Sequence, residues 1–137
     1  MSVKSVRQAL EVAVGAWSAA NANFPIAWEN VPYKPAQNTA YLRLNLLPAE
    51  TENPSLGDAH KRYVGILQAS IYLKEGDGTA TATTTADSLL NYFARGQSFT
   101  VGQIVVRVLN SPSINPALNV EGWYILPVSI RYQADVF

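Results

Sequence analysis

The residues best suited to chemistry include the only histidine of the chain, His60, which follows Asp58 in a polar stretch. A histidine held by an acid could be the base for a serine nucleophile, and the same two side chains could begin a metal site. However, the sequence has no G-x-S-x-G elbow for the serine, and two ligands on a loop do not make a metal site. We therefore expect His60 to be a solvated loop residue.

Carboxylates could also do chemistry, and each pair has a simpler interpretation. Glu50 and Glu52 could act as general acid and base, but they lie two residues apart in a polar loop bounded by prolines. Glu75 and Asp77 form part of a Glu-Gly-Asp-Gly sequence that is similar to a fragment of a calcium loop, yet threonines follow where further acids are needed. This stretch also lacks the third glycine and the Lys-Ser/Thr of a phosphate cradle. We predict no catalytic residue, no metal and no cofactor.

Composition narrows the class of protein. The chain of 137 residues has the length of one domain, and we expect residues 1–137 to form a single domain. Ten basic residues balance ten acidic ones, and the only adjacent basic pair is Lys61-Arg62. Neutralising phosphates takes clustered cations, so specific nucleic-acid binding is not expected. No apolar run approaches the roughly 20 residues of a membrane span.

Two further features of the composition concern location and surface. The chain has no cysteine, which fits a protein made in a reducing cytoplasm. Only 15% of its residues are charged, against about 25% in a typical domain. Burial of part of the surface in an assembly would account for this deficit.

Hydrophobic periodicity predicts the elements that would position these residues. Apolar residues recur every three or four positions over 3–17, and a second helix is predicted over 79–95, with Gly96 just beyond its end. Alternating polar and apolar residues predict strands, with a bulge at Gly65 and a bulge or unpaired edge at Pro127. The predicted strands cover 26–28, 41–47, 62–74, 104–109 and 121–134.

The polar segment 48–61 contains prolines, a glycine and three acids without periodicity, and we predict a long flexible surface loop there. Residues 110–119 form a second predicted loop. The order helix, strand, strand, long strand, helix, strand, strand predicts an α+β fold. Its sheet would be mostly antiparallel but mixed, and curved, with the two helices packed on one face.

Aromatic residues away from the apolar stripes could contact a partner. Tyr41, Tyr63 and Tyr72 are predicted on the faces opposite the leucine stripes, and Trp123 and Tyr124 on opposite faces of the last strand. Tyrosine and tryptophan are enriched in protein interfaces. A second layer of the same domain would explain these aromatic residues equally well.

The order and spacing of several short sequences resembles the phage tail terminator family, the small tail-terminator-like proteins of long-tailed phages and prophages. The resemblance covers nearly the whole chain, beginning with the opening helix. The sequences that carry it are Phe24-Pro25-Ile26-Ala27-Trp28-Glu29-Asn30, Tyr41-Leu42-Arg43, Gly65-Ile66-Leu67-Gln68-Ala69-Ser70-Ile71, Gly76 to Gly78, Ala86-Asp87, Phe93-Ala94-Arg95-Gly96 and Pro127-Val128-Ser129-Ile130-Arg131-Tyr132.

This resemblance implies a structural virion protein without catalytic residues. Such proteins form a hexameric ring that caps the finished tail tube, stops its growth and offers its other face to the neck of the capsid. The implied partners are further copies of the chain, the tail tube protein and a head–neck connector protein, while DNA passes through the ring. The implied location is the virion tail, after synthesis in the bacterial host cytoplasm. The free protein would be either a ring already or a monomer until assembly.

Closing a ring requires a patch on each subunit that meets a different patch on the next. We expect exposed sheet edges and aromatic faces to supply these patches, and the acidic loop to face the tube or its lumen, where acids would repel DNA. The residues assigned to this assembly interface as a hypothesis are Glu50, Glu52, Asp58, Lys61, Arg62, Tyr72 and Trp123.

Two alternatives remain open at this point. The chain could be another virion joint of similar build, such as a neck adaptor or a tail-completion protein. From a different class, it could be a small-molecule-binding protein or an enzyme with a pocket between sheet and helices. That last alternative predicts a monomer or dimer whose melting temperature rises with a ligand.

Overall fold

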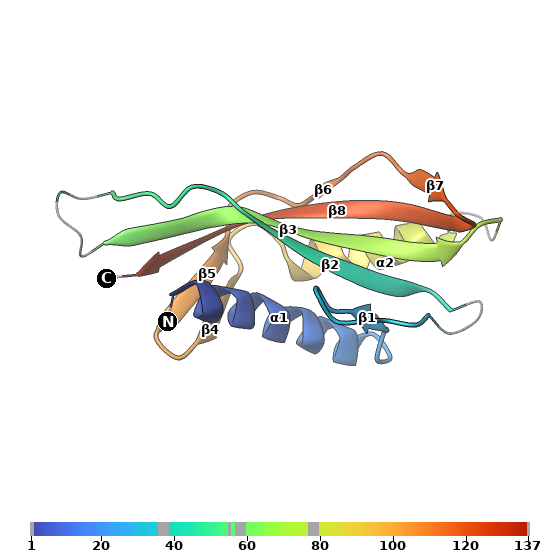
Figure 1. The fold of residues 1–137 in the computed structure, drawn as a ribbon, viewed down its shortest axis with the longest axis horizontal. Coiled ribbons are helices and arrows are strands. Elements are labelled where there is room, and N and C mark those ends of the chain that lie inside the picture. The colour runs from blue at the N-terminus through green and yellow to red at the C-terminus, as the bar shows by residue number, and fades with distance from the viewer. Residues whose placement is uncertain (1, 36–38, 55, 57–59, 77–79, 137) are drawn as a thin grey trace.

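The computed structural model describes residues 2–35, 39–54, 56, 60–76 and 80–136. Two long strands, β3 (Lys61–Lys74) and β8 (Trp123–Val136), run the length of the molecule beside the shorter β2 (Tyr41–Pro48), and two helices lie against them (Figure 1). The elements are α1 (Ser2–Ala20), β1 (Ile26–Ala27), β2 (Tyr41–Pro48), β3 (Lys61–Lys74), α2 (Ala80–Tyr92), β4 (Ser98–Val101), β5 (Ile104–Val108), β6 (Ser113–Ile114), β7 (Leu118–Val120) and β8 (Trp123–Val136).

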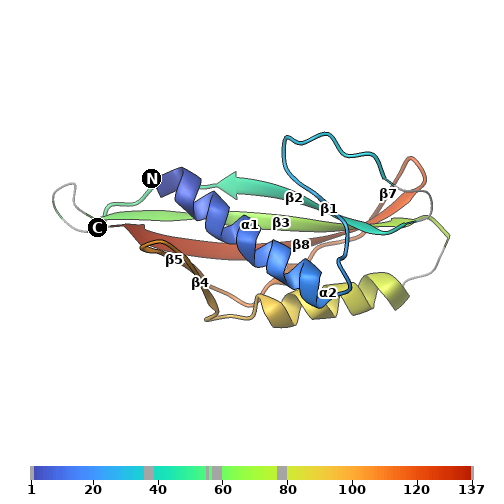
Figure 2. The same cartoon turned by 90° about the horizontal axis from the view of Figure 1, so that it is seen from below.

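The eight strands form one sheet with the order β1-β2-β3-β8-β5-β4, and β6 and β7 also pair with β8. β1 runs parallel to β2, whereas every other pair is antiparallel. The sheet is therefore mixed, and it curls around the helices. Both helices lie on the same side of it (Figure 2). The predicted α+β class, with a mostly antiparallel curved sheet and two helices on one face, is confirmed.

The predicted apolar stripes form one core between the helices and the sheet. In α1 the stripe is buried from Val6 to Trp17, and in α2 Ala82, Ala86 and Leu89 are buried, with Phe93 just beyond the helix end. Alternate residues of β2, β3 and β8 face the same core, as their period of two requires. These strand residues are Leu42, Leu44, Leu46, Leu67, Ala69, Ile71, Leu73, Leu126, Val128, Ile130 and Tyr132.

A partly exposed carboxylate, that of Glu29, links α1 to the sheet. Arg7 donates a hydrogen bond from Nη1 to Oε1 of Glu29 at 2.7 Å, and the backbone N–H of Leu46 donates to the same oxygen at 3.0 Å. Because β1 pairs with only two residues of β2, this end of β2 has backbone groups without a strand partner on that side. Glu29 therefore supplies an acceptor that a longer β1 would otherwise provide.

The bulge predicted at Gly65 is wrong. The register of β3 against both β2 and β8 is continuous through this residue, which pairs with Pro48 and Tyr132. A Cβ at this position would lie 2.6 Å from the Tyr132 hydroxyl and 2.7 Å from the Leu47 carbonyl oxygen. Glycine is needed here because neighbouring groups approach the backbone closely, and not because the strand bends.

The interruption predicted at Pro127 is present on the edge of β8 that pairs with β6 and β7. Pairing with β3 continues through Ser70 and Pro127. On the other side of β8, Ile114 pairs with Val128 and Leu118 pairs with Ile125. A step of four residues along the β6–β7 segment therefore corresponds to a step of three residues along β8. The register shift of one residue falls beside Pro127, whose carbonyl accepts from the Asn115 N–H at 2.9 Å but which has no N–H to donate in return.

Three short strands were not predicted. β4 and β5 form a hairpin through Gly102 and Gln103, and Gly102 has a positive φ of 61°. A glycine opening a two-residue turn between alternating runs is a hairpin signal that the sequence carries. β6 and β7 lie within the predicted loop 110–119. The last strand starts two residues later than predicted, because Glu121 and Gly122 form the turn before it.

Neither helix in the described ranges has the length and apolar character needed to cross a membrane.

Candidate assembly surfaces

The side of the sheet away from the helices, called here the outer face, carries a group of aromatic residues at one end. Tyr41 stacks on Tyr72 with ring centroids 4.8 Å apart, and Trp123 packs edge-on against Tyr41 at 5.3 Å. Tyr33 covers Tyr41 from the segment before β2, also at 4.8 Å. Tyr41 is only 3% exposed, whereas Tyr72 and Trp123 are half-buried.

Arg43 completes this group, and we call the five residues the aromatic patch. Its guanidinium carbon lies 5.5 Å from the centroid of Tyr72 and 5.9 Å from that of Tyr41, within the range of a cation–π contact. Interaction with the Tyr41 side chain raises the pKa of Arg43 and outweighs the lowering effect of burial. The patch therefore holds a fixed positive charge between aromatic rings.

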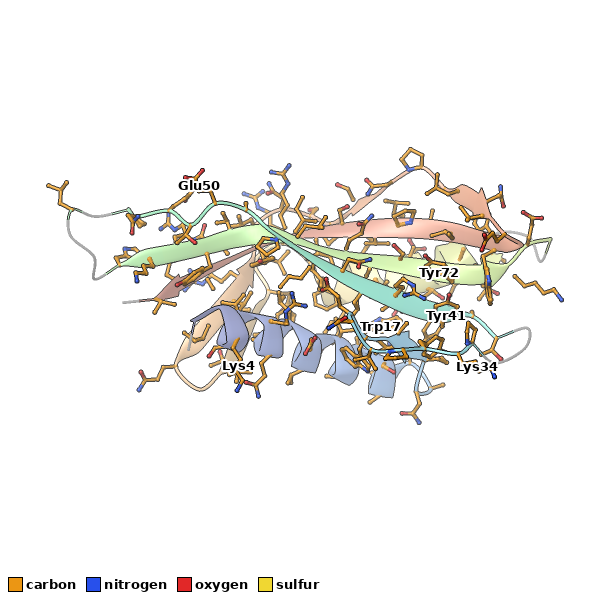
Figure 3. All side chains as sticks on the ribbon, in the orientation of Figure 1. Lys4, Trp17, Lys34, Tyr41, Glu50 and Tyr72 are labelled. Atoms are coloured by element: carbon orange, nitrogen blue, oxygen red, sulfur yellow. The ribbon has the colours of Figure 1, made fainter. Side chains whose placement is uncertain are left out.

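At the other end of the sheet, residues 49–54 continue β2 as an extended segment, called here the acidic arm. Its backbone remains hydrogen-bonded to β3: the Ala49 N–H donates to the Val64 carbonyl at 2.9 Å, and Glu52 and Arg62 exchange bonds of 2.9 and 2.8 Å. Glu50 and Glu52 are exposed, and the Glu50 side chain points away from α1 (Figure 3). The first part of the predicted loop 48–61 is thus paired to the sheet, with Pro48 in β2 and Lys61 in β3.

Three side chains converge on Asp135 beside the arm. His60 Nε2 and Arg62 Nε lie 2.8 and 2.9 Å from Oδ1, and Gln133 Nε2 donates to Oδ2 at 3.1 Å. Burial by itself raises the pKa of Asp135, but the hydrogen bonds from Arg62, His60 and Gln133 outweigh it, so the pKa lies below its usual range. His60 is therefore a hydrogen-bond partner of Asp135 with a side chain only 16% exposed, and the expectation of a solvated loop histidine is wrong.

We expect this cluster to stabilise the protein in a pH-dependent way. Because the pKa of Asp135 is lower in the folded chain than its ordinary 3.8, the stabilisation is present above that value and is lost as the pH falls below it. Asp135→Asn should lower the free energy of unfolding by about 1 kcal/mol at pH 7, since the pair is partly exposed. Urea unfolding followed by circular dichroism at pH 7 and pH 3 measures both values.

At pH 3 the difference between Asp135→Asn and the wild type should shrink. Asp87→Asn, at an exposed acid on α2, is the matched control and should behave like the wild type at both pH values. Equal stability of Asp135→Asn and the wild type at pH 7 would contradict a stabilising role for the cluster.

The β6–β7 segment forms a free edge of the sheet with apolar side chains. Ile114, Leu118 and Val120 are 44, 53 and 47% exposed. Both strands pair with β8 on one side only, within the part of the chain that the structure describes. An edge of this kind offers unpaired backbone groups and apolar side chains to another chain. The sequence does not reveal this edge, because β6 and β7 are too short for an alternating pattern to be visible.

The structure leaves little space between α1 and the central strands, whereas an open hollow of about 500 Å³ lies beside the start of α1, where Ser5 faces residues 101–104, Asp135 and Val136. The hollow between α1 and the central strands has a volume of about 10 Å³ and is lined by Arg7, Leu10, Glu11, Glu29, Leu44, Leu46 and Leu67. This is hardly room for one water molecule. In the described ranges, no three His, Cys, Asp or Glu side chains are grouped to hold a metal ion.

Comparison with known families favours one of the remaining interpretations. The family model for the phage tail terminator protein matches residues 5–132, nearly the whole chain. The chain belongs to the phage tail terminator family. Its role is accordingly structural, in the virion tail, and its partners are components of the tail or of the head–tail joint. No curated protein matches the sequence.

Two solved structures share the fold of this chain. One, which has no descriptive name, is 27% identical with a TM-score of 0.82, and the alignment covers 100% of this chain and 98% of the other. The second is a chain from a structure titled as the virion of a native gene transfer agent particle. It is 18% identical with a TM-score of 0.66, and the alignment covers 96% of this chain and 98% of the other.

The residues assigned to the assembly interface do not form one site. Tyr72 and Trp123 lie in the aromatic patch, whereas Glu50, Glu52, Lys61 and Arg62 lie at the opposite end of the sheet. Tyr72 is the tenth residue after Arg62 along β3, which is about 33 Å along a strand. Asp58 lies outside the described residues. Tyr63, predicted opposite the leucine stripe, instead packs against the core.

Proposed function

We propose that this tail terminator assembles as a hexameric ring on the end of the tail tube, ends tube growth and presents the opposite face of the ring to the neck of the capsid. The observation that carries the proposal is membership of the tail terminator family over residues 5–132. In this proposal the partners are further copies of the chain, the tail tube protein and a head–neck connector protein. DNA passes through the ring without specific contacts, and the chain is made in the host cytoplasm.

Features of the surface support an assembly role. Closing a ring takes two different complementary patches on each subunit. The chain offers the aromatic patch at one end of the outer face, the acidic arm at the other, and the apolar edge at β6–β7. We propose that these surfaces account for the low share of charged residues, and that the protein acts without catalysis.

The test is the length of tail tubes. Growing tubes mixed with the protein should stop at a uniform length, with a six-fold annulus at the head-proximal end in electron micrographs. Tubes grown without the protein should continue to lengthen. A second measurement uses a variant in which Ile114, Leu118 and Val120 are all replaced by serine. In this proposal the apolar edge contributes to assembly, so the variant should cap tubes less well than the wild type.

Two outcomes would contradict the proposed termination of tail tubes. If tubes keep growing in the presence of folded protein, the chain does not terminate tails. If the protein instead binds empty capsids and leaves tube length unchanged, it is a neck adaptor.

A further inference from the structure

We propose that the acidic arm of one copy binds the aromatic patch of the next copy, with Glu50 and Glu52 meeting Arg43. This inference rests on the proposed ring and adds the contact between neighbouring subunits. It assigns the acids of the arm to a protein–protein contact, whereas the sequence had suggested that they face the tube or its lumen.

Arg43 is surrounded by uncharged side chains on the outer face. It lies at the end of this face that carries the aromatic patch, and the neighbouring outward residues in β2 and β3 are Tyr41, Asn45, Gln68, Ser70 and Tyr72, none of which is acidic. No carboxylate pairs with it among the described residues. Stacking on two tyrosines restrains the guanidinium, and a restrained guanidinium suits bidentate binding of a carboxylate.

The composition of the patch is typical of the residues that dominate binding energy. Tyrosine, tryptophan and arginine are enriched among interface residues whose loss costs the most affinity. Here Tyr72 and Trp123 remain half-buried although they pack on each other and on Tyr41. A partner that covered them would desolvate Arg43 as well, so a carboxylate in that partner would be strongly favoured.

The acidic arm supplies such carboxylates. Glu50 and Glu52 are exposed, and no cation pairs with either of them in the described ranges. The nearest arginine along the ladder, Arg62, is already bound to Asp135 at 2.9 Å. The backbone bonds of Ala49 and Glu52 to β3 hold the arm extended, so less conformational entropy is lost on binding.

The two surfaces cannot meet within one molecule, because Glu50 and Glu52 lie about 23 and 30 Å from Arg43 along β2 and the arm that continues it. A contact between them therefore joins different patches on two copies. Repeated head to tail, such contacts produce closed rings or open filaments, whereas two copies packed antiparallel would make the contact twice in a dimer. The proposed ring uses the head-to-tail arrangement, in which each subunit offers its aromatic patch to one neighbour and its acidic arm to the other.

Charge reversal tests the contact. Arg43→Glu faces a wild-type arm with like charge, and the double variant Glu50→Arg/Glu52→Arg does the same to a wild-type patch. Each variant alone should lower the fraction of ring at least about tenfold, measured by native mass spectrometry and on tail tubes. Mixed together, the two variants should assemble again, because each arm then meets a patch of opposite charge. The restored rings should contain the two variants in strict alternation.

Matched reversals elsewhere are the controls. Arg107→Glu on β5 and Asp87→Arg on α2 reverse exposed charges outside both surfaces and should assemble like the wild type. A variant that had merely failed to fold could not be rescued by mixing. If either reversed variant forms rings alone, or if mixing restores nothing, the contact is wrong. An arm that lines the lumen would leave Glu50→Arg/Glu52→Arg rings intact, and a patch that binds the tube protein would leave Arg43→Glu rings intact.

A disulfide separates failure of the contact from failure of the proposed function. The chain has no cysteine, so Glu50→Cys and Arg43→Cys each introduce a single thiol. A mixture of these two variants should form a linked heterodimer in oxidising buffer, and it should do so even if the protein does not cap tubes. Absence of this product at concentrations where the wild type forms rings would overturn the contact alone.

Discussion

Replacing Trp17 by alanine should lower the free energy of unfolding by about 4 kcal/mol, as large truncations in a core do. The side chain is 1% exposed and packs edge-on against Phe24 at 5.5 Å. Its indole Nε1 donates to the Ser88 hydroxyl at 3.0 Å, which joins α1 to α2. Alanine would leave a cavity between the two helices and remove the donor. Urea unfolding followed by far-ultraviolet circular dichroism gives the value.

Two further variants separate the parts of this effect. Trp17→Phe keeps much of the packing but loses the hydrogen bond, and Ser88 still donates to Asn21 at 2.9 Å, so we expect a smaller loss of about 1–2 kcal/mol. Val12→Ala on the same helix removes a side chain that is 56% exposed and should change stability by less than about 0.5 kcal/mol. A loss for Trp17→Ala no larger than that of Val12→Ala would refute the packing of α1 described here.

Replacing Gly65 by alanine should lower the free energy of unfolding by about 2–3 kcal/mol, the usual cost of overpacking. The new Cβ would lie 2.6 Å from the Tyr132 hydroxyl and 2.7 Å from the Leu47 carbonyl oxygen. Tyr132 is 2% exposed and has little room to move, and the Leu47 carbonyl belongs to the neighbouring strand. Relief would therefore need a shift in the pairing of β2 with β3. Thermal unfolding and urea unfolding both measure the loss.

Gly15→Ala is the matched control, with an effect of opposite sign. A Cβ at Gly15 meets nothing within 4 Å, and alanine favours the interior of a helix over glycine by about 1 kcal/mol, so this variant should be more stable than the wild type. Adding Tyr132→Phe to Gly65→Ala removes the hydroxyl contact and should recover part of the loss, while the clash with Leu47 remains. If Gly65→Ala were as stable as Gly15→Ala, the close approach of the strands would be wrong.

The long strands and both helices were predictable because each one carries its own pattern. Leu42, Leu44 and Leu46 alternate with polar residues, and the stripe from Val6 to Trp17 repeats at helical spacing, so local burial determines these elements. Their faces were predictable for the same reason. The short strands β4, β6 and β7 were not predicted, because two to four residues are too few to show a period and these strands exist only through pairing with β5 or β8.

Part of the candidate interface was predictable in the same way. Tyr72 and Trp123 were assigned from the sequence as outward aromatic residues, and the structure places both on the outer face. That both pack on Tyr41, with Arg43 over the rings of Tyr41 and Tyr72, could not be predicted, because these residues lie on three different strands. The register of those strands is set by the whole sheet. The cluster at Asp135 was missed for a similar reason, since Arg62 and Asp135 are 73 residues apart.

By itself the sequence determined the fold class, the faces of the long strands, the absence of a recognisable catalytic motif and the resemblance to the tail terminator family. All of these depend on residue types at short, regular spacing. The packing of remote segments places the acidic arm and the aromatic patch at opposite ends of one sheet. It also makes glycine necessary at position 65, where Tyr132 and Leu47 approach the backbone closely. These properties depend on distances between strands, which the pairing of remote segments determines.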